Sequence, residues 1–270
     1  MTKSAFLWLR EHPAFRGISE ASISTLESCC SVLRFDLGGQ LCEPDEIAAR
    51  ILVILQGQAR LVGRHNGRLT TVGKLGPGSV VGAASLLSGV PCENVIASGE
   101  VIAFAISDQL WSELYSREAS FRYWCDQQLW PQELLKLLEV LEQNTPESDS
   151  SALEKLEEAL KSAEHCPPDQ PAVQAALDAG KQLYVTSGWG ELTIGQPIRS
   201  SAYLPPCEPF ALRLVSLPAA SGADAAEDKQ DNRADFLVPG AFIQDAEGLP
   251  PVSSFSPERN VVDRLSLIRA

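Results

Sequence analysis

The chain has 270 residues, of which 44% are hydrophobic, and a formal net charge of −13. This length and composition fit two modest globular domains and exclude a chain that is disordered throughout. The acidic balance argues against broad contact with nucleic acid or an anionic membrane, because such contact needs clustered basic residues, which the sequence lacks.

Helical spacing of apolar residues characterises the first part of the chain. From Phe6 to Arg34 these residues recur with the helical period, and Ser19 has the character of an N-cap that opens a helix. Short β-like runs punctuated by glycine follow at Ile51–Leu55, Ala59–Val62, Leu69–Val72, Ser79–Val81, Val95–Ala97 and Val101–Ile106. Strands at this spacing predict an antiparallel roll over Phe35–Ile106.

The helical period returns after Ser107 and predicts two or three helices, with Pro131 in a first helical turn. The polar stretch Gln143–Ser151 has the composition of a linker. We therefore place a first domain, a roll with flanking helices, at residues 1–142 and the linker at residues 143–151.

Residues 152–218 are predicted to form a small α+β connector domain. The elements expected in it are helices at Ala152–Ala163 and Ala172–Ala179, a loop in the stretch HCPPDQP, strands at Leu183–Ser187 and Glu191–Ile194 joined by a turn at Gly188–Gly190, and a strand at Ala211–Ser216. We expect this unit to be loosely attached through the linker. Residues 146–270 hold 10 Lys/Arg and 19 Asp/Glu, and residues 219–270 have the composition of an acidic, partly disordered tail.

The segment Leu75–Ser98, LGPGSVVGAASLLSGVPCENVIAS, lies between two apolar runs. It resembles the phosphate-binding cassette of the cyclic-nucleotide-binding family, in which G-x-x-F-G-E-x-A-L is followed by P-R-x-A. The matching positions are Gly78, Gly82, Leu86, Gly89 and Pro91. The resemblance extends over about Phe6–Leu138 and implies an α+β fold, with an antiparallel β-roll (jelly roll) and flanking helices, followed here by the connector unit.

In that family, helix N-terminal amides meet the cyclic phosphate, an arginine pairs with its anionic oxygen and a glutamate accepts the ribose hydroxyl. Alignment places Ala83 at the glutamate position and Cys92 at the arginine position, so both side-chain anchors are missing. An uncompensated phosphate charge costs roughly 2–5 kcal/mol, or about two to four decades in affinity. We therefore predict a degenerate cassette that does not bind cyclic AMP or cyclic GMP. Its residues are Gly82, Ala83, Ala84, Ser85, Cys92 and Glu93.

Other features of this cassette leave alternatives open. Glu93 adds a carboxylate near the phosphate position, with the alternative that strand alternation points it away. Ser85 stands where the family has alanine and could offer a hydroxyl, and the backbone amides over Val81–Ala84 are expected to be free. Cys92 is interpreted as a small buried side chain, with redox sensing or metal capture as alternatives.

The remaining candidate groups give no support for an enzyme. The seven cysteines lack the C-x-x-C spacing of a zinc site, and the pair His165–Cys166 is expected on a flexible linker that would not preorganise catalysis. P-loop, serine-hydrolase and zinc-protease motifs are absent. We predict no catalytic residue, cofactor or metal. The lack of a signal peptide and of a membrane-length apolar run favours a cytoplasmic protein.

Two stretches, QGQARLVG (Gln56–Gly63) and GVPCENVIASGEVIAFAIS (Gly89–Ser107), resemble the N-terminal regulatory region of cyanobacterial-type peptidase-containing ABC exporters, and Tyr184–Pro218 resembles the connector that follows it. The resemblance implies a regulatory or docking module of a bacterial secretion system, with an ABC exporter as partner and a location peripheral to the inner membrane. A cyclic-nucleotide receptor with altered contacts is an alternative. A catabolite-activator-like transcription regulator is disfavoured, because no helix-turn-helix follows.

Overall fold

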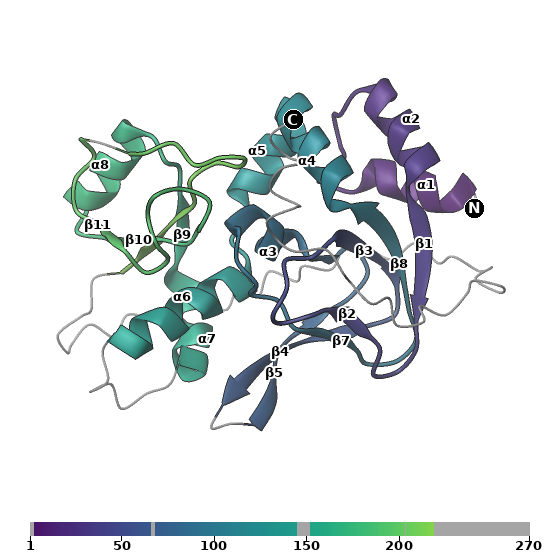
Figure 1. Ribbon diagram of the computed structural model, residues 1–270, viewed down its shortest axis with the longest axis horizontal. Coiled ribbons are helices and arrows are strands. Elements are labelled where there is room, and N and C mark those ends of the chain that lie inside the picture. Colours follow the sequence, from purple (N-terminus) through teal and green to yellow (C-terminus); the bar gives the residue numbers. More distant parts are fainter. Residues whose placement is uncertain (1–2, 66–67, 145–151, 203, 219–270) are drawn as a thin grey trace.

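The computed structural model describes residues 3–65, 68–144, 152–202 and 204–218, and its first part is an antiparallel β-roll (Figure 1). The strands of the roll are β1 (Ser31–Phe35), β2 (Gln40–Cys42), β3 (Arg50–Gln56), β4 (Ala59–His65), β5 (Arg68–Leu75), β6 (Val80–Val81), β7 (Val95–Ala97) and β8 (Val101–Ser107). They form two antiparallel four-stranded sheets with the orders β1-β8-β3-β6 and β2-β7-β4-β5. The predicted roll is confirmed.

The central strands β3 and β8 are apolar apart from polar residues at their ends, because their sheet is covered on both faces. Side chains alternate along a strand, so Leu52 points to the second sheet while Val53 points to the helices. One cluster of buried side chains lies between the sheets and another lies beneath the helices. This two-sided burial accounts for the unbroken apolar run Ile51–Leu55.

Helices flank the roll on both sides in the sequence. They are α1 (Lys3–Glu11), α2 (Glu20–Cys29), α4 (Asp108–Arg117), α5 (Ala119–Gln127) and α6 (Pro131–Asn144), and a further short helix, α3 (Ala83–Ser88), lies within the roll between β6 and β7. The predicted N-cap of α2 is confirmed, because the Ser19 hydroxyl accepts the N–H of Ser22 at 3.2 Å. The expectation that the helical region extends to Arg34 is wrong, because β1 begins at Ser31 and pairs over its whole length with β8. Pairing with a strand so distant in the chain leaves no mark on local periodicity.

A buried histidine ties the N-terminal helices to the roll. His12 is 3% exposed, its Nε2 lies 2.9 Å from the carbonyl oxygen of Gly78, and its Nδ1 accepts the N–H of Ala14 at 3.2 Å. Burial lowers the pKa of His12, and the bond to Gly78 opposes this only in part. The ring is therefore held neutral, with the proton on Nε2.

A second unit with a sheet of its own follows the roll. Its elements are α7 (Ala152–Ser162), β9 (Glu164–Cys166), α8 (Gln170–Asp178), β10 (Gln182–Val185), β11 (Pro197–Ile198) and β12 (Leu214–Leu217). The sheet has the order β11-β10-β12-β9 and is antiparallel. The predicted helices and the strands near residues 183–187 and 211–216 are present with shifted ends.

Two predictions for this unit are wrong. The stretch HCPPDQP was expected as a loop, but its first two residues belong to β9, which pairs with β12 at the edge of the sheet. Glu191–Ile194 is irregular rather than a strand, because the chain turns later, at Gly195. This glycine has a φ of 81° and donates its N–H to the Val185 carbonyl oxygen at 2.9 Å. The strand that pairs with β10 is therefore β11.

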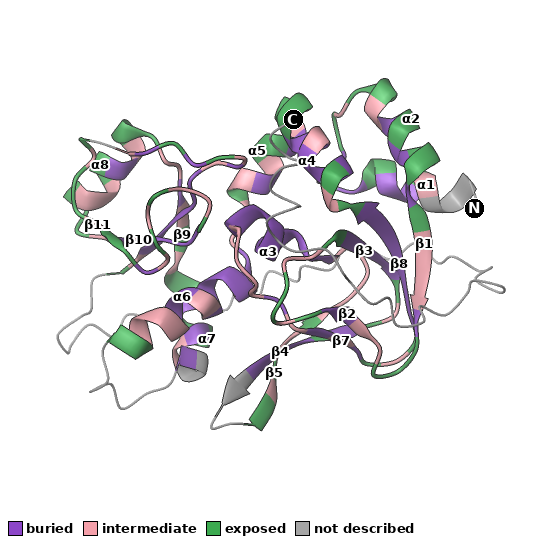
Figure 2. Ribbon diagram, viewed as in Figure 1, coloured by how far each residue is buried: buried purple, intermediate pink, exposed green. Residues whose placement is uncertain are grey.

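The second unit packs closely against the roll, so the expected loose attachment is wrong. One face of its sheet packs on α8, and the other, through Val215, packs on α6 and α7. Phe210 is buried beneath the helices of the roll, with its ring centroid 5.0 Å from that of Tyr115 in α4. Figure 2 shows buried residues in both α3 and α6, where the two parts meet. A stretch can have the composition of a linker even when the residues that follow it pack against the domain that precedes it.

The predicted linker at 143–151 begins too early, because Gln143 and Asn144 still belong to α6. The rest of it, residues 145–151, and the predicted tail at 219–270 lie outside the described residues. Within the described ranges, no helix combines the length and the apolar run needed to cross a membrane. The division into domains at 1–142 and 152–218 stays a prediction.

Candidate functional site

The cassette predicted from the sequence is the turn from β6 into the short helix α3. Gly82 makes this turn with a φ of 93°, and a Cβ there would lie 2.8 Å from both the Ala48 Cβ and the Arg50 carbonyl oxygen. Only glycine fits at such a position. The turn buries all six residues of α3 and leaves the backbone donors at its amino end facing the protein interior.

The Glu93 carboxylate fills the amino end of α3. Its Oε1 accepts the N–H of Gly82 at 2.9 Å, and its Oε2 accepts the N–H of Ser85 at 3.0 Å and the Ser85 hydroxyl at 3.1 Å. Gln132 in the first turn of α6 donates from Nε2 to Oε1 at 3.3 Å. Glu93 and Ser85 are both 0% exposed. The carboxylate therefore takes the backbone donors that an external anion would need.

Glu93 is held by neutral donors, since no cation forms an ion pair with it in the described part of the chain. Burial raises the pKa of the Glu93 carboxyl, and the hydrogen bonds from Ser85 and Gly82 oppose this rise without cancelling it. The Oε1 of Gln132 is buried without a partner. A protonated Glu93 could donate to that oxygen after rotation of the amide, so the pair has two possible hydrogen-bonding arrangements.

The structure brings Gly82, Ser85 and Glu93 together, with the backbone of Ala84 bonded to the same carboxylate. The side chains of Ala83 and Ala84 are fully buried in the cluster beneath the helices. The question of where Glu93 points is resolved, because its side chain is directed inward. The expectation of free backbone amides over Val81–Ala84 is wrong for Gly82 and Ala84, whose N–H groups the same carboxylate accepts.

Cys92, at the family's arginine position, is partly buried, with its sulfur 4.0 Å from the Ser88 hydroxyl. Burial raises the pKa of the Cys92 thiol, and the neighbouring Glu93 adds to the rise. A thiol that stays protonated is a poor nucleophile and a poor metal ligand. No group of three potential metal ligands lies together in the described ranges.

The second unit closes the opposite end of α3. The last carbonyl groups of a helix have no partner within it. Here the Trp189 indole donates from Nε1 to the Leu86 carbonyl oxygen at 2.9 Å. The Gly188 N–H donates to the Ser88 carbonyl oxygen at 2.6 Å. The Trp189 ring covers Gly89, where a Cβ would lie 2.7 Å from the ring atoms. Protein groups thus satisfy both ends of the cassette helix.

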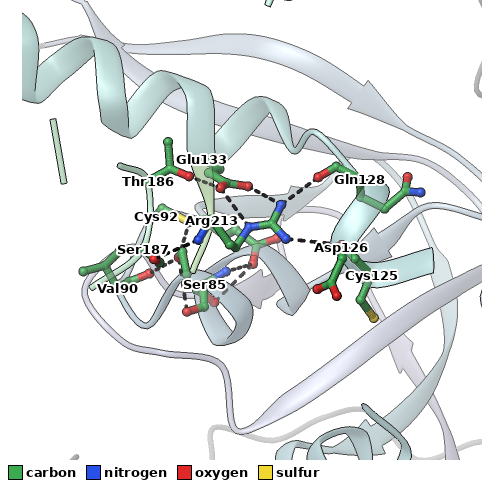
Figure 3. A network of polar contacts seen from close by, with 12 residues as sticks. Ser85, Val90, Cys92, Cys125, Asp126, Gln128, Glu133, Thr186, Ser187 and Arg213 are labelled. Carbon is green, nitrogen blue, oxygen red and sulfur yellow. Dashed lines mark hydrogen bonds and ion pairs between the residues drawn. The ribbon is translucent and has the colours of Figure 1, made fainter. Parts of the chain in front are cut away.

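A buried ion pair joins Arg213, the residue just before β12, to Glu133 in α6 (Figure 3). Arg213, 2% exposed, donates from Nε and Nη2 to the two oxygens of Glu133 at 2.9 and 2.8 Å. The same guanidinium donates to the carbonyl oxygens of Cys125 at 3.2 Å and Gln128 at 2.7 Å, and the Thr186 hydroxyl donates to Glu133. Burial alone would lower the pKa of Arg213, but the Glu133 carboxylate raises it on balance. Arg213 is therefore a fixed cation, and each of its three guanidinium nitrogens has a hydrogen-bond partner.

Four residues of this region were not predicted from the sequence to belong to a site: Gln132, Glu133, Trp189 and Arg213. Glu133 lies in the first turn of α6, where an acidic residue is ordinarily favoured, so nothing in the sequence indicates an ion pair there. Trp189 offered a signal, because a large aromatic residue between two glycines is unusual in an exposed turn and indicates a packed one.

The pair His165–Cys166 shows no catalytic arrangement. His165 lies in β9, where its backbone pairs with that of Val215, and its Nδ1 is buried without a partner in the described residues. Burial and then Arg213 lower the pKa of His165 to about 4, while burial raises that of Cys166. These shifts keep the imidazole and the thiol neutral. The expected flexible linker is instead an edge strand, but the conclusion that the pair does not form a nucleophilic site is unchanged.

The family model for the cyclic nucleotide-binding domain matches residues 32–118. This range contains nearly all of both sheets of the roll, α3 and Glu93. Residues 32–118 are a cyclic nucleotide-binding domain. Such domains are regulatory rather than catalytic. The matched range ends at the start of α5, so the cyclic nucleotide-binding domain is joined here to α6 and a second unit that the family model does not include.

Several solved structures resemble part of the chain. They include a regulatory subunit of a cAMP-independent protein kinase A from Trypanosoma cruzi bound to guanosine (18% identity, TM-score 0.37, covering 45% of this chain and 47% of that one). A cyclic nucleotide-binding-like protein from Brucella abortus has 18% identity and a TM-score of 0.36, covering 42% and 97%. The sensor domain of a transcriptional regulator from Pseudomonas aeruginosa has 15% identity and a TM-score of 0.41, covering 54% and 94%. The chain spans about half the length of the trypanosomal subunit, and no curated protein matches it.

Proposed function

We propose that the chain is a non-enzymatic regulatory or docking module whose cyclic nucleotide-binding domain works without a nucleotide. The observation that carries the proposal is the Glu93 carboxylate, which accepts the N–H groups of Gly82 and Ser85 at the amino end of the cassette helix. An incoming cyclic phosphate would need the same donors. The candidate site is the degenerate cassette predicted from the sequence, with Glu93 as its resident anion.

Charge explains why a nucleotide does not displace Glu93. Two anions at one site repel each other, and neither would have a cation, because Cys92 replaces the arginine that would pair with a phosphate. Moving Glu93 aside would also leave a buried carboxylate without its donors, or oblige it to take up a proton. The alternative, a cyclic-nucleotide receptor with altered contacts, requires a cation that reaches the cassette.

The test is calorimetric titration of the full chain with cyclic AMP and cyclic GMP. We expect no binding at micromolar concentrations, and a dissociation constant near 1 µM, about −8 kcal/mol, would overturn the proposal. The double variant Cys92→Arg with Glu93→Ala frees the backbone donors and returns a cation, so it should gain measurable affinity. Cys92→Arg alone is the matched control, because its guanidinium would pair with Glu93. Equal affinity in the two variants would show that Glu93 does not block the site.

We further propose an ABC exporter of a bacterial peptide or protein secretion system as the partner, which would place the chain in the cytoplasm at the inner membrane. The support is the sequence resemblance of Gln56–Gly63, Gly89–Ser107 and Tyr184–Pro218 to the regulatory region and connector of such exporters. The test is co-elution of the full chain with a purified exporter encoded beside its gene. Independent elution at micromolar concentrations of both would contradict this partner.

A further inference from the structure

Two cationic side chains stand directly opposite each other on the outer face of the second sheet of the roll. Arg60 in β4 and Lys74 in β5 are register partners, and both are exposed. Ala59 and Leu61 point into the core between the sheets, so alternation along the strand directs Arg60, and Lys74 opposite it, to the other face. Like charges directly opposite on antiparallel strands repel each other. The pair is therefore unfavourable unless an anion lies beside it.

The described part of the chain supplies no such anion. Neither side chain forms an ion pair there, whereas the surface cations Arg10, Arg34 and Lys181 each pair with a glutamate. The surrounding sequence adds no acidic group either, because residues 47–92 contain no Asp or Glu. An isolated basic spot thus remains on a chain whose net charge is −13.

The place of the two cations in the sheet indicates what kind of ligand they suit. β5 is the outermost strand of its sheet, and β4 and β5 project from the roll beside α7 (Figure 1). A lysine on an exposed edge discourages pairing with another chain, which would explain Lys74 by itself. Arg60 lies on the inner strand β4, where this explanation does not apply. Two cations are too few for the broad basic surface that nucleic acid needs, so they suit a few carboxylates of a polypeptide.

The chain itself carries suitable carboxylates within reach. Residues 222–235, outside the described ranges, contain five Asp/Glu and two Lys/Arg, which gives a net charge of −3. We call them the acidic stretch. The described chain stops at Pro218, just after Leu217, and the side chains of Leu217 and of Val72 in β5 pack against the same cluster of α6 and α7. An extended chain advances about 3.3 Å per residue, which lets the acidic stretch reach β5.

We propose that Arg60 and Lys74 form a docking site for the acidic stretch of the same chain. Its carboxylates offset the repulsion between the two cations and lie along the free edge of β5. Exposed ion pairs are weak one by one, but a covalent tether gives the stretch an effective concentration on the order of millimolar. The contact does not depend on whether the cassette binds a nucleotide, so it goes beyond the proposed function.

Carbodiimide cross-linking of the full chain, read by mass spectrometry, tests the site. The reagent joins an amine to a carboxylate in contact with it, forming an amide while the carbodiimide takes up the water that is lost. Lys74 should become linked to an acid of the acidic stretch, and the link of Lys181 to its partner Glu164 serves as the internal reference. In Arg60→Gln the ratio of the first link to the second should fall about two- to fivefold, the value of one exposed ion pair. Arg117→Gln, which removes an exposed cation at the end of α4, is the matched control and should leave the ratio unchanged.

Three results would overturn the docking site. The first is a Lys74 that links only to acids outside the acidic stretch, or to none, while the reference link forms. The second is an unchanged ratio in Arg60→Gln. The third is a Lys74 link that joins unlabelled to isotope-labelled chains in an equal mixture, since the stretch would then dock on a second copy. Binding of cyclic AMP by the unmodified chain would contradict the proposed function and alter none of these readouts.

Discussion

Replacing Glu93 by Gln keeps the size of the side chain and removes one of its two acceptor oxygens. The carboxylate accepts the N–H groups of Gly82 and Ser85, the Ser85 hydroxyl and the Gln132 amide. A carboxamide can accept at only one side, so its NH2 group must face one of the two backbone donors. A buried donor left without an acceptor costs about 1–3 kcal/mol, and release of the buried charge offsets part of this. We expect the free energy of unfolding to fall by about 1–3 kcal/mol.

The effect of Glu93→Gln should depend on pH. Because burial raises the pKa of Glu93 above its ordinary value of 4.5, the folded protein binds this proton more readily than the unfolded chain does. The contribution of Glu93 to stability is then fully present below pH 4.5 and is lost as pH rises through the folded pKa. The advantage of the native protein over the variant should therefore shrink with rising pH, by at most about 1.4 kcal/mol per pH unit.

Urea denaturation at several pH values between 4 and 8 measures both effects. Glu46→Gln is a matched control, because Glu46 is exposed and close to the cassette in the sequence, and its loss should change stability by no more than about 0.5 kcal/mol. A Glu93→Gln protein more stable than the native protein at pH 7 would refute the reasoning, since the carboxylate would then not be the preferred partner of the amides. So would parallel pH profiles for the two proteins.

Three further outcomes are expected. Arg213→Met leaves Glu133 buried and unpaired, so urea denaturation should show that the free energy of unfolding falls by about 3–5 kcal/mol. The double variant with Glu133→Met should recover most of this loss, and an equal loss in both variants would contradict the pairing argument. Burial lowers the pKa of His12, so its contribution to stability is full above pH 6.5 and is lost as pH falls through the folded pKa. In His12→Gln, thermal unfolding should therefore lose the part of its acid sensitivity that comes from this histidine. In Gly57→Ala, the new Cβ would lie 2.0 Å from a backbone oxygen, so the free energy of unfolding should fall by more than about 2 kcal/mol. Gly38→Ala, whose Cβ would meet no atom within 4 Å, should lower it by only about 1 kcal/mol. Similar losses in the two variants would contradict the steric account.

The roll could be predicted from the sequence because its signals are local. Apolar runs such as Ile51–Leu55 mark strands covered on both faces, and a glycine such as Gly82 marks a backbone conformation that other residues avoid. The short edge strands gave weaker signals. β9 contains only Glu164–Cys166, and its character comes from pairing with β12 rather than from its own residues.

The direction of Glu93 and the partner of Arg213 could not be predicted, for two different physical reasons. Glu93 lies outside β7, so strand alternation does not apply to it, and its direction is set by the turn that precedes that strand. Arg213 and Glu133 are 80 residues apart, and each side chain alone fits an ordinary exposed position. Only packing of the second unit on α6 brings them together, and the sequence carries no local trace of that contact.

The two buried carboxylates lead to one conclusion about how this protein can be regulated. Burial of an ion pair contributes little net stability when compared with apolar residues of the same volume, so the pair of Glu133 with Arg213 is better explained by the way it fixes the second unit on α6. Glu93 likewise does what an apolar residue at its position could not, because the donors of Gly82 and Ser85 would then need water or a bound anion. With Glu93 in place, the cassette has its donors satisfied before any effector arrives. A signal that acts on this domain through the cassette must therefore displace Glu93 or change contacts between the protein's own parts.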